Sequence, residues 1–163
     1  MTGIVTAVSL SPKEGVPKYP QAQITLGRFG IEGDYHNREM RPSFSQRGAW
    51  KPNTDRHVTI IAEEVLQELN RKLGTGLKPG DLGENITSRG LDDLSQVADG
   101  SIIQIAGAIL RVSKQNTPCG VLRRAYGLSV RQALEERRGL LCAIERGAGA
   151  IIRPGDLMKV SGP

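Results

Sequence analysis

Glycine and proline interrupt this chain so often that few long regular elements can form in it. The 163 residues include 20 glycines and nine prolines, which favours short strands joined by tight turns over a helical bundle. The phrase Pro-Gly-Asp-Leu follows both Lys78 and Arg153, and Pro followed by Gly suits a type II turn. A chain of this length fits one domain, so we expect residues 1–163 to form a single domain.

Short apolar runs rich in β-branched residues predict the strands. They cover residues 3–10, 21–26, 57–61, 101–106, 108–113, 140–144, 149–153 and 157–160. A helix is predicted over residues 62–73, with acidic residues early, basic residues late and Gly74 as its stop. Ser129 with Gln132 three residues later forms a capping box for a second helix, which Gly139 ends. The sequence thus predicts a mainly β (α+β) fold, with a barrel-like core and two or three short helices.

Residues 37–56 show no hydrophobic period, which predicts a long loop that is functional or disordered. Five basic and two acidic residues leave this stretch a charge of +3, and Phe44 and Trp50 lie among them. Basic residues with interleaved aromatic residues can grip a single nucleic-acid strand. A charge of +3 over twenty residues is small for that role. We therefore expect either a lid that covers a binding site or a solvated loop.

The overall charge and the chain start bear on location and partners. The net charge of +5 favours anionic partners, such as a phosphorylated cofactor or RNA. The first residues lack the charged and apolar regions of a signal peptide. No apolar run approaches the roughly 20 residues of a membrane span. We therefore expect a cytoplasmic protein with reduced thiols and no membrane partner.

Cys119 is the residue that most strongly suggests chemistry. It lies between a proline and a glycine directly after a predicted strand, so we expect its thiol at a strand end and outside the core. Lys114, Arg123 and Arg124 are close in sequence, and if they are also close in space they lower the pKa of this thiol. A thiolate is both a nucleophile and a soft metal ligand. The alternative is a small buried hydrophobic residue, which is our interpretation of Cys142 in its apolar run.

Several common catalytic and metal sites do not fit the sequence. There is no C-x-x-C pair, and His36 and His57 are 21 residues apart, which does not suit a four-ligand zinc site. No G-x-S-x-G elbow, Walker loop or dinucleotide fingerprint occurs. We interpret His57, which opens a strand, as structural, and His36 as either a surface residue in a turn or part of a site.

Six short pieces occur in a fixed order along the chain and carry a family resemblance. They are Lys13 with Gly15-Val16-Pro17, Gly33-Asp34-Tyr35-His36, Asp55-Arg56-His57-Val58, Lys78-Pro79-Gly80-Asp81-Leu82-Gly83-Glu84-Asn85-Ile86, Thr117-Pro118-Cys119 and Arg153-Pro154-Gly155-Asp156. Each piece alone is weak, but the ordered set resembles the MOSC family, the module named for the C-terminal part of molybdenum cofactor sulfurases. The chain is similar to a small, stand-alone member of that family.

The resemblance implies a MOSC-type β-barrel and a molybdenum–pterin cofactor (Mo-molybdopterin) with its metal on Cys119. The candidate cofactor-binding residues are Lys13, His36, Arg56, Asn85, Thr117, Lys114 and Arg123. Among these, Lys13 is the foremost candidate for the phosphate of the cofactor, which needs cationic and backbone donors. Asn85 and Thr117 are candidates for hydrogen bonds to the pterin or to the oxo groups of the metal.

The resemblance also implies two alternative functions. In the first, the protein is a molybdenum-dependent reductase of N-hydroxylated or N-oxygenated small molecules, and separate electron-donor proteins supply it. In the second, it is a sulfur or cofactor carrier whose Cys119 accepts persulfide sulfur from a PLP-dependent cysteine desulfurase. The sequence leaves both open. Nucleic-acid binding through residues 37–56 is the least favoured function.

Overall fold

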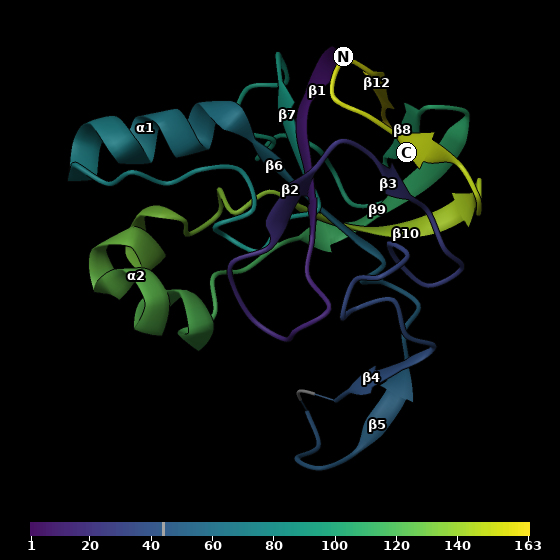
Figure 1. Cartoon of the computed structure of the whole chain (residues 1–163), viewed down its shortest axis with the longest axis horizontal. Coiled ribbons are helices and arrows are strands. Elements are labelled where there is room, and N and C mark those ends of the chain that lie inside the picture. The colour runs from purple at the N-terminus through teal and green to yellow at the C-terminus, as the bar shows by residue number, and fades with distance from the viewer. Residues whose placement is uncertain (44) are drawn as a thin grey trace.

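The computed structural model describes residues 1–43 and 45–163 (Figure 1). Phe44, one of the two aromatic residues noted in the basic stretch, lies outside the described residues. The strands are β1 (Thr2–Leu10), β2 (Tyr19–Gln21), β3 (Ile24–Thr25), β4 (Met40–Pro42), β5 (Trp50–Pro52), β6 (Val58–Ala62), β7 (Ile86–Arg89), β8 (Ile102–Ile105), β9 (Ala108–Gln115), β10 (Leu140–Arg146), β11 (Ile151–Ile152) and β12 (Leu157–Ser161). The helices are α1 (Glu63–Leu73) and α2 (Gly120–Ala133).

Seven strands close into a barrel in the order β12-β8-β9-β10-β6-β7-β1, because β1 pairs with β12 as well as with β7. In the closing pair, Thr2 lies opposite Lys159 and Gly3 opposite Met158. β2 extends the sheet from the far end of β1. All neighbours are antiparallel except β6 and β7, which α1 connects. Closure leaves the seven strands without a free edge, and the mainly β prediction is confirmed.

The barrel is filled by aliphatic side chains that alternate along the strands. Ile103, Leu110, Val112 and Met158 are among the fully buried ones. Cys142 on β10 is also fully buried, and this burial raises the pKa of its thiol to about 12. Alternate residues of the strands thus fill the barrel, and Cys142 belongs to the core as interpreted from the sequence.

The first helix agrees closely with its prediction, since α1 begins one residue later and ends at the same residue. Val65, Leu66 and Leu69 form its buried face. Gly74 closes it with a φ of 64°, a conformation that costs glycine little. α1 and α2 lie on the same flank of the barrel (Figure 1). Neither helix, within the described chain, is long and apolar enough to cross a membrane.

The second helix differs from its prediction because α2 begins directly after Cys119, not at Ser129. Leu122 packs into the core from the first turn, which stabilises helix well before the capping box. At Gly127 the helix breaks, with a φ of 90° and a ψ of 174°. Ser129 follows this break, so its signal belongs to the second half of the helix only.

Three other predictions need correction. The run 21–26 is divided between β2 and β3. β7, with the sequence ITSR, was not predicted, because it is short and only one of its four residues is apolar. Residues 37–56 are not a loop throughout: β4 and β5 form a two-stranded ribbon that projects from the barrel (Figure 1). A ribbon this short has too few residues to show a period.

Candidate functional site

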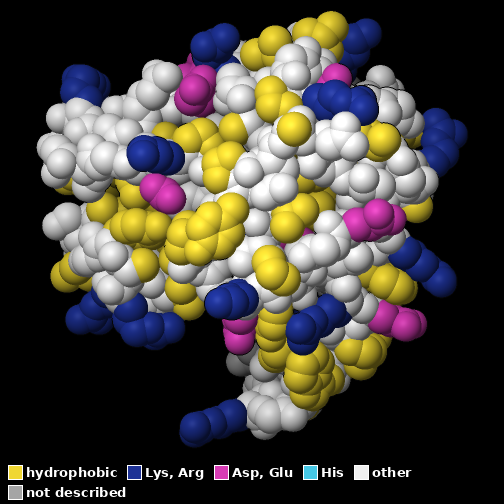
Figure 2. Space-filling model, in the orientation of Figure 1, with side chains coloured by type: hydrophobic (Ala, Val, Ile, Leu, Met, Phe, Trp, Pro, Cys, Tyr) yellow, Lys and Arg dark blue, Asp and Glu magenta, His cyan; other side chains and the backbone are white. Residues whose placement is uncertain are grey.

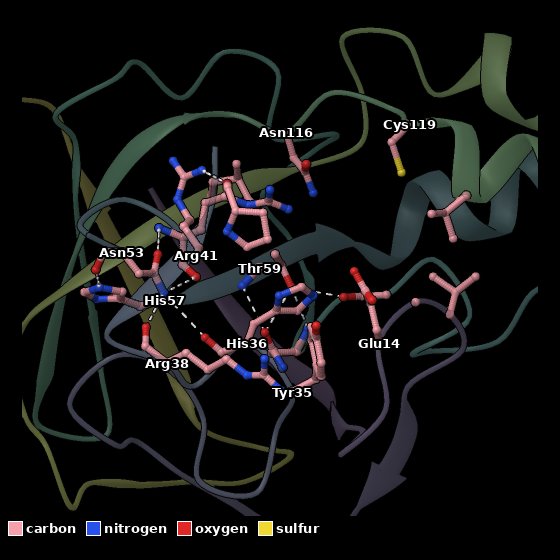
Figure 3. A pocket seen from close by; sticks show the side chains of 18 of the residues that line it. Glu14, Tyr35, His36, Arg38, Arg41, Asn53, His57, Thr59, Asn116 and Cys119 are labelled. Carbon is pink, nitrogen blue, oxygen red and sulfur yellow. Dashed lines mark hydrogen bonds between the residues drawn. The ribbon is translucent and has the colours of Figure 1, made fainter. Parts of the chain in front are cut away.

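A cavity of about 480 Å³ opens beside the barrel. Its walls come from six parts of the chain: the loop after β1, the segment before and within β4, the segment that leads into β6, the loop before β7, the segment from the end of β9 to the start of α2, and the turn that leads into β10. Figure 3 shows the side chains that point into it. Elements far apart in sequence therefore meet here because the barrel brings their ends together.

Cys119 lies at one end of this cavity, next to Asn116 (Figure 3). Its thiol is free and exposed, and its backbone is extended where α2 begins. Burial alone raises the pKa of the thiol, but the Arg138 guanidinium and the backbone N–H groups of Val121 and Leu122 outweigh it and hold that pKa below its ordinary value. The surroundings of Cys119 therefore favour the thiolate.

Arg138 enters the site from the turn between α2 and β10. Its Nη1 donates to the Thr117 carbonyl at 2.7 Å, and its Nη2 donates to the Leu82 carbonyl at 3.3 Å. Its Nε–H is buried and has no hydrogen-bond acceptor among the described residues. Arg138 thus fastens the cysteine turn to the loop before β7 and keeps one donor for another group.

The position of Arg138 depends on the glycine that follows it. Gly139 has a φ of 81°, and a Cβ on it would lie 1.9 Å from the Ile60 carbonyl oxygen. Only glycine allows the chain to approach β6 this closely and with this backbone. The fixed turn therefore holds the Arg138 side chain against Cys119.

Cations gather along the cavity wall. Burial lowers the pKa of the Arg56 guanidinium, and the neighbouring charges of Arg41 and Arg138 lower it further, so these three groups are close together. Lys114 also lines the cavity, and Glu14 is the single carboxylate among its described lining residues. The cavity is therefore suited to an anionic ligand.

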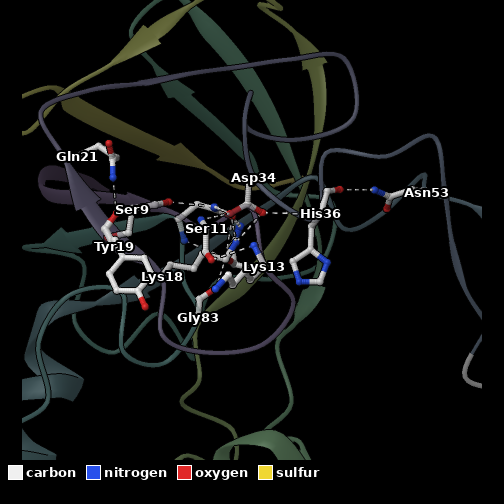
Figure 4. A network of polar contacts seen from close by, with 12 residues as sticks. Ser9, Ser11, Lys13, Lys18, Tyr19, Gln21, Asp34, His36, Asn53 and Gly83 are labelled. Atoms are coloured by element: carbon white, nitrogen blue, oxygen red, sulfur yellow. Dashed lines mark hydrogen bonds and ion pairs between the residues drawn. The ribbon is translucent and has the colours of Figure 1, made fainter.

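A buried ion pair holds the motif that contains His36 (Figure 4). Lys18 and Asp34 are in contact at 2.9 Å, with side chains that are 3% and 1% exposed. Asp34 also accepts hydrogen bonds from the backbone N–H of Ser11 and of His36. A buried carboxylate with this many donors fixes the loop around it, so Asp34 places His36 in the cavity.

His36 itself is neutral near pH 7. Burial and the neighbouring charge of Lys18 lower the pKa of its imidazole to about 4. Asn85, also in the cavity wall, has its amide engaged: Nδ2 donates to the Ser9 carbonyl, and Oδ1 accepts from the backbone N–H of Thr59. His36 thus offers hydrogen bonds and not charge, and Asn85 shapes the wall.

Of the residues proposed from the sequence, the cavity brings six together and leaves two outside. The six are His36, Arg56, Asn85, Lys114, Thr117 and Cys119. Lys13 and Arg123 are exposed and do not line it. The cation against the thiol is Arg138, 19 residues along the chain, since α2 directs the side chains of Arg123 and Arg124 to solvent.

His57, the second histidine, has a structural position, as predicted. His57 is buried, and its Nδ1 accepts from the backbone N–H of Ile144 while its Nε2 lies 2.6 Å from the Asn53 carbonyl. Arg38, Arg41, Asn116 and Arg138 also line the cavity, and the sequence did not single them out. In the sequence, the one signal for Arg138 is its place before Gly139, and that glycine predicts only the end of a helix.

These residues fit a sulfur-ligated, phosphorylated cofactor. The exposed thiolate of Cys119 is a soft ligand suited to a high-valent metal. The Arg56 and Arg138 guanidinium groups suit a phosphate, and the buried Nε–H of Arg138 offers a donor to an acceptor on the cofactor. A molybdenum–pterin cofactor therefore has candidate contacts for its metal and for its anionic groups.

The protein is thus a closed seven-stranded β-barrel with a cysteine in a cationic cavity that is suited to a ligand. The family model described as MOSC domain matches residues 22–159. The chain belongs to the MOSC domain family, which is associated with binding of the molybdenum cofactor. A comparison with curated proteins finds no match.

Solved structures show the same fold. The chain is similar to the YuaD protein from Bacillus subtilis, with a TM-score of 0.88 and 23% identity over 100% of this chain and 97% of that one. YiiM from Geobacillus stearothermophilus gives a TM-score of 0.72 and 20% identity over 99% and 75% of the two chains. YiiM from Escherichia coli gives 0.65 and 20% over 100% and 71%.

Proposed function

We propose that this protein holds a molybdenum–pterin cofactor through Cys119 and reduces N-hydroxylated small molecules. The observation that carries the proposal is the thiolate-favouring Cys119 at one end of a cationic cavity. Membership of the MOSC family supports the proposal that the protein binds this cofactor. The reductase activity goes beyond what family membership supports. A small-molecule substrate would reach the metal through the same opening that exposes the thiol.

In this proposal the residues of the chain bind and orient. Cys119 provides a sulfur ligand, while Arg56 and Arg138 contact the phosphate and other acceptors. His36 is neutral at pH 7, so it donates or accepts hydrogen bonds without adding charge. When bound, the cofactor supplies a metal that changes its oxidation state by two electrons and takes up oxygen.

The overall reaction must balance in electrons and protons. The N–O bond of an N-hydroxylated compound is broken, and two electrons and two protons convert it to the reduced nitrogen compound and water. The electrons come from a separate electron-donor protein, and the protons from solvent. Cys119 is neither oxidised nor consumed, since it serves as a ligand.

The second candidate function is a sulfur carrier, favoured by the exposure of the same thiol. The Cys119 thiolate attacks the outer sulfur of a desulfurase persulfide, a new S–S bond forms on Cys119, and the desulfurase thiolate leaves. No net oxidant is needed. This function requires an accessible thiolate but not the cationic cavity around it, which is why the reductase is preferred.

The two functions are separated by two assays, one on protein that carries the cofactor and one on cofactor-free protein. With dithionite-reduced methyl viologen as donor, the wild-type protein isolated from a host that makes the cofactor should convert a benzamidoxime to the amidine, and Cys119→Ser should not. Incubation of cofactor-free protein with a cysteine desulfurase and cysteine tests the carrier. No amidine together with a mass gain of one sulfur on Cys119 would replace the reductase by the carrier.

A further inference from the structure

The β4–β5 ribbon has one apolar face that is entirely exposed. Met40 lies opposite Pro52, and Pro42 opposite Trp50. Opposite residues and second neighbours point to the same side of a two-stranded ribbon, so these four side chains share a face, which we call the ribbon face. All four are exposed, with Met40 at 41% and Trp50 at 55%.

Polar contacts join the two chain segments at the root of the ribbon and do not use the side chains of the ribbon face. Arg41 points to the other side, where its Nη2 donates to both carboxylate oxygens of Asp55 at 2.7 and 2.9 Å. The Asn53 side chain donates to the Arg38 carbonyl at 3.1 Å, and its backbone N–H donates to the Glu39 carbonyl at 2.7 Å. Figure 2 shows the apolar side chains of the ribbon standing out from the molecule.

The ribbon face is continuous with the cavity and has a basic border. Met40 and Pro42 also line the cavity that contains Cys119. Arg38, which precedes β4, and Arg47, in the turn between β4 and β5, are exposed, and Figure 2 shows Lys and Arg side chains at the edge and end of the ribbon. An occupant of this face would therefore lie at the mouth of the cavity, in a positive field.

We propose that the ribbon face is the docking surface for an acidic electron-transfer protein, which supplies the electrons for the proposed reduction. The inference rests on the proposed function, because that reaction needs a donor at the cavity. One turnover takes two electrons from two carrier molecules, each oxidised by one electron, and two protons from solvent. An apolar centre with Trp and Met inside a charged rim is typical of protein–protein interfaces.

Other occupants fit the ribbon less well. A second copy of the chain carries the same net charge of +5, so the two basic borders would repel. A single nucleic-acid strand is bound by successive stacking aromatics, whereas the described ribbon has one, Trp50. An anionic membrane would meet only four apolar side chains, fewer than stable anchoring takes.

The test compares a protein donor with a small chemical donor. Reduced flavodoxin and reduced plant-type ferredoxin, both acidic carriers, are used beside methyl viologen, which needs no docking surface. The variants are Trp50→Ser and Arg47→Glu, neither of which lines the cavity. Leu157→Ser and Lys159→Glu are the matched controls, since Leu157 is 60% exposed and both lie on β12.

Trp50→Ser should weaken carrier binding, measured by calorimetry, by about 10-fold or more, as expected for a central aromatic residue. Arg47→Glu should weaken it about 3–10-fold at low salt, and less at high salt. Carrier-driven turnover should fall in parallel, while methyl viologen turnover, molybdenum content and both controls stay unchanged. A loss of turnover with every donor would point to failure of the proposed function and not of the docking surface.

Four results would overturn the proposal. The first is equal binding and turnover of Trp50→Ser and Leu157→Ser with the carriers. The second is that neither carrier binds or supports turnover where methyl viologen does. The third is a larger blue shift of the emission of Trp50, the only tryptophan, with an oligonucleotide or anionic vesicles than with a carrier. The fourth is self-association that Trp50→Ser abolishes.

Discussion

The two cysteines of this protein lie in opposite surroundings. Cys142 is fully buried in β10, where burial raises the pKa of its thiol to about 12. Cys119 is exposed at the start of α2, where Arg138 and two backbone N–H groups hold the pKa of its thiol below its ordinary value. The same side chain is thus a buried core residue in one place and an exposed thiol biased toward its thiolate in the other. The difference comes from a nearby cation and peptide dipoles, not from the cysteine itself.

Alkylation gives the sharpest contrast between the two. At pH 7, iodoacetamide should label Cys119 at least about 100-fold faster than Cys142, because only Cys119 is both accessible and biased to the thiolate. Peptide mapping by mass spectrometry identifies the labelled residue. Cys119→Ser should abolish labelling of the folded protein. Cys142→Ala should keep the label and lose about 1 kcal/mol of unfolding free energy. Label on Cys142 in folded protein would remove the contrast.

Gly139 connects the two regions, since it follows Arg138 and precedes the strand of Cys142. Gly139→Ala should lower the free energy of unfolding by about 3 kcal/mol or more, because a Cβ would lie 1.9 Å from the Ile60 carbonyl oxygen. Gly149→Ala is the control, with a φ of 88° and no atom within 4 Å, and should cost about 1 kcal/mol. Equal losses in urea unfolding would show that the close approach to β6 is unimportant.

The pH dependence of stability that His36 causes shows whether the cavity wall is as desolvated as the core. Its folded-state pKa is about 4, below the ordinary 6.5. The unfolded chain therefore binds a proton first as the pH falls, and the free energy of unfolding should drop by up to about 3 kcal/mol between pH 6.5 and pH 4. His36→Gln should show a shallower fall over this window in urea titrations. The same slope in both proteins would mean that His36 is solvated.

Replacement of Arg138 should give the smallest of these effects, a moderate change in the reactivity of the Cys119 thiol. Arg138→Met removes the cation beside Cys119, so the thiol pKa should rise and the alkylation rate at pH 7 should fall by about 3–10-fold. Arg123→Met, which alters an exposed side chain outside the cavity, should leave the rate unchanged. If Arg123→Met had the larger effect, the sequence neighbour and not the structural neighbour would set the reactivity.

Local signals in the sequence predicted much of the barrel. Short apolar runs rich in β-branched residues indicated most strands. Both Pro-Gly-Asp turns agree with type II geometry, since Gly80 and Gly155 have φ values of 93° and 98°. Cys119 was found because a proline and a glycine flank it, a strictly local pattern. Turn chemistry and strand period depend on neighbouring residues, so a sequence alone can show them.

The remainder of the site depends on contacts between distant segments. Arg138 reaches the cysteine turn only because the turn between α2 and β10 brings the chain back to it, and Lys18, not its sequence neighbour Lys13, is buried against Asp34. The ribbon face needs the register of β4 with β5. Pairings of this kind are decided by tertiary packing, which leaves no periodic trace in a short segment.

Molybdenum per chain tests the central claim most directly. The protein is expressed in a host that makes the pterin cofactor, and metal is measured by plasma mass spectrometry for the wild type, Cys119→Ser and Cys142→Ala. We predict near-stoichiometric molybdenum in the wild type and in Cys142→Ala, and its loss in Cys119→Ser. Equal molybdenum in all three proteins, or none in any of them, would contradict a cofactor held through Cys119.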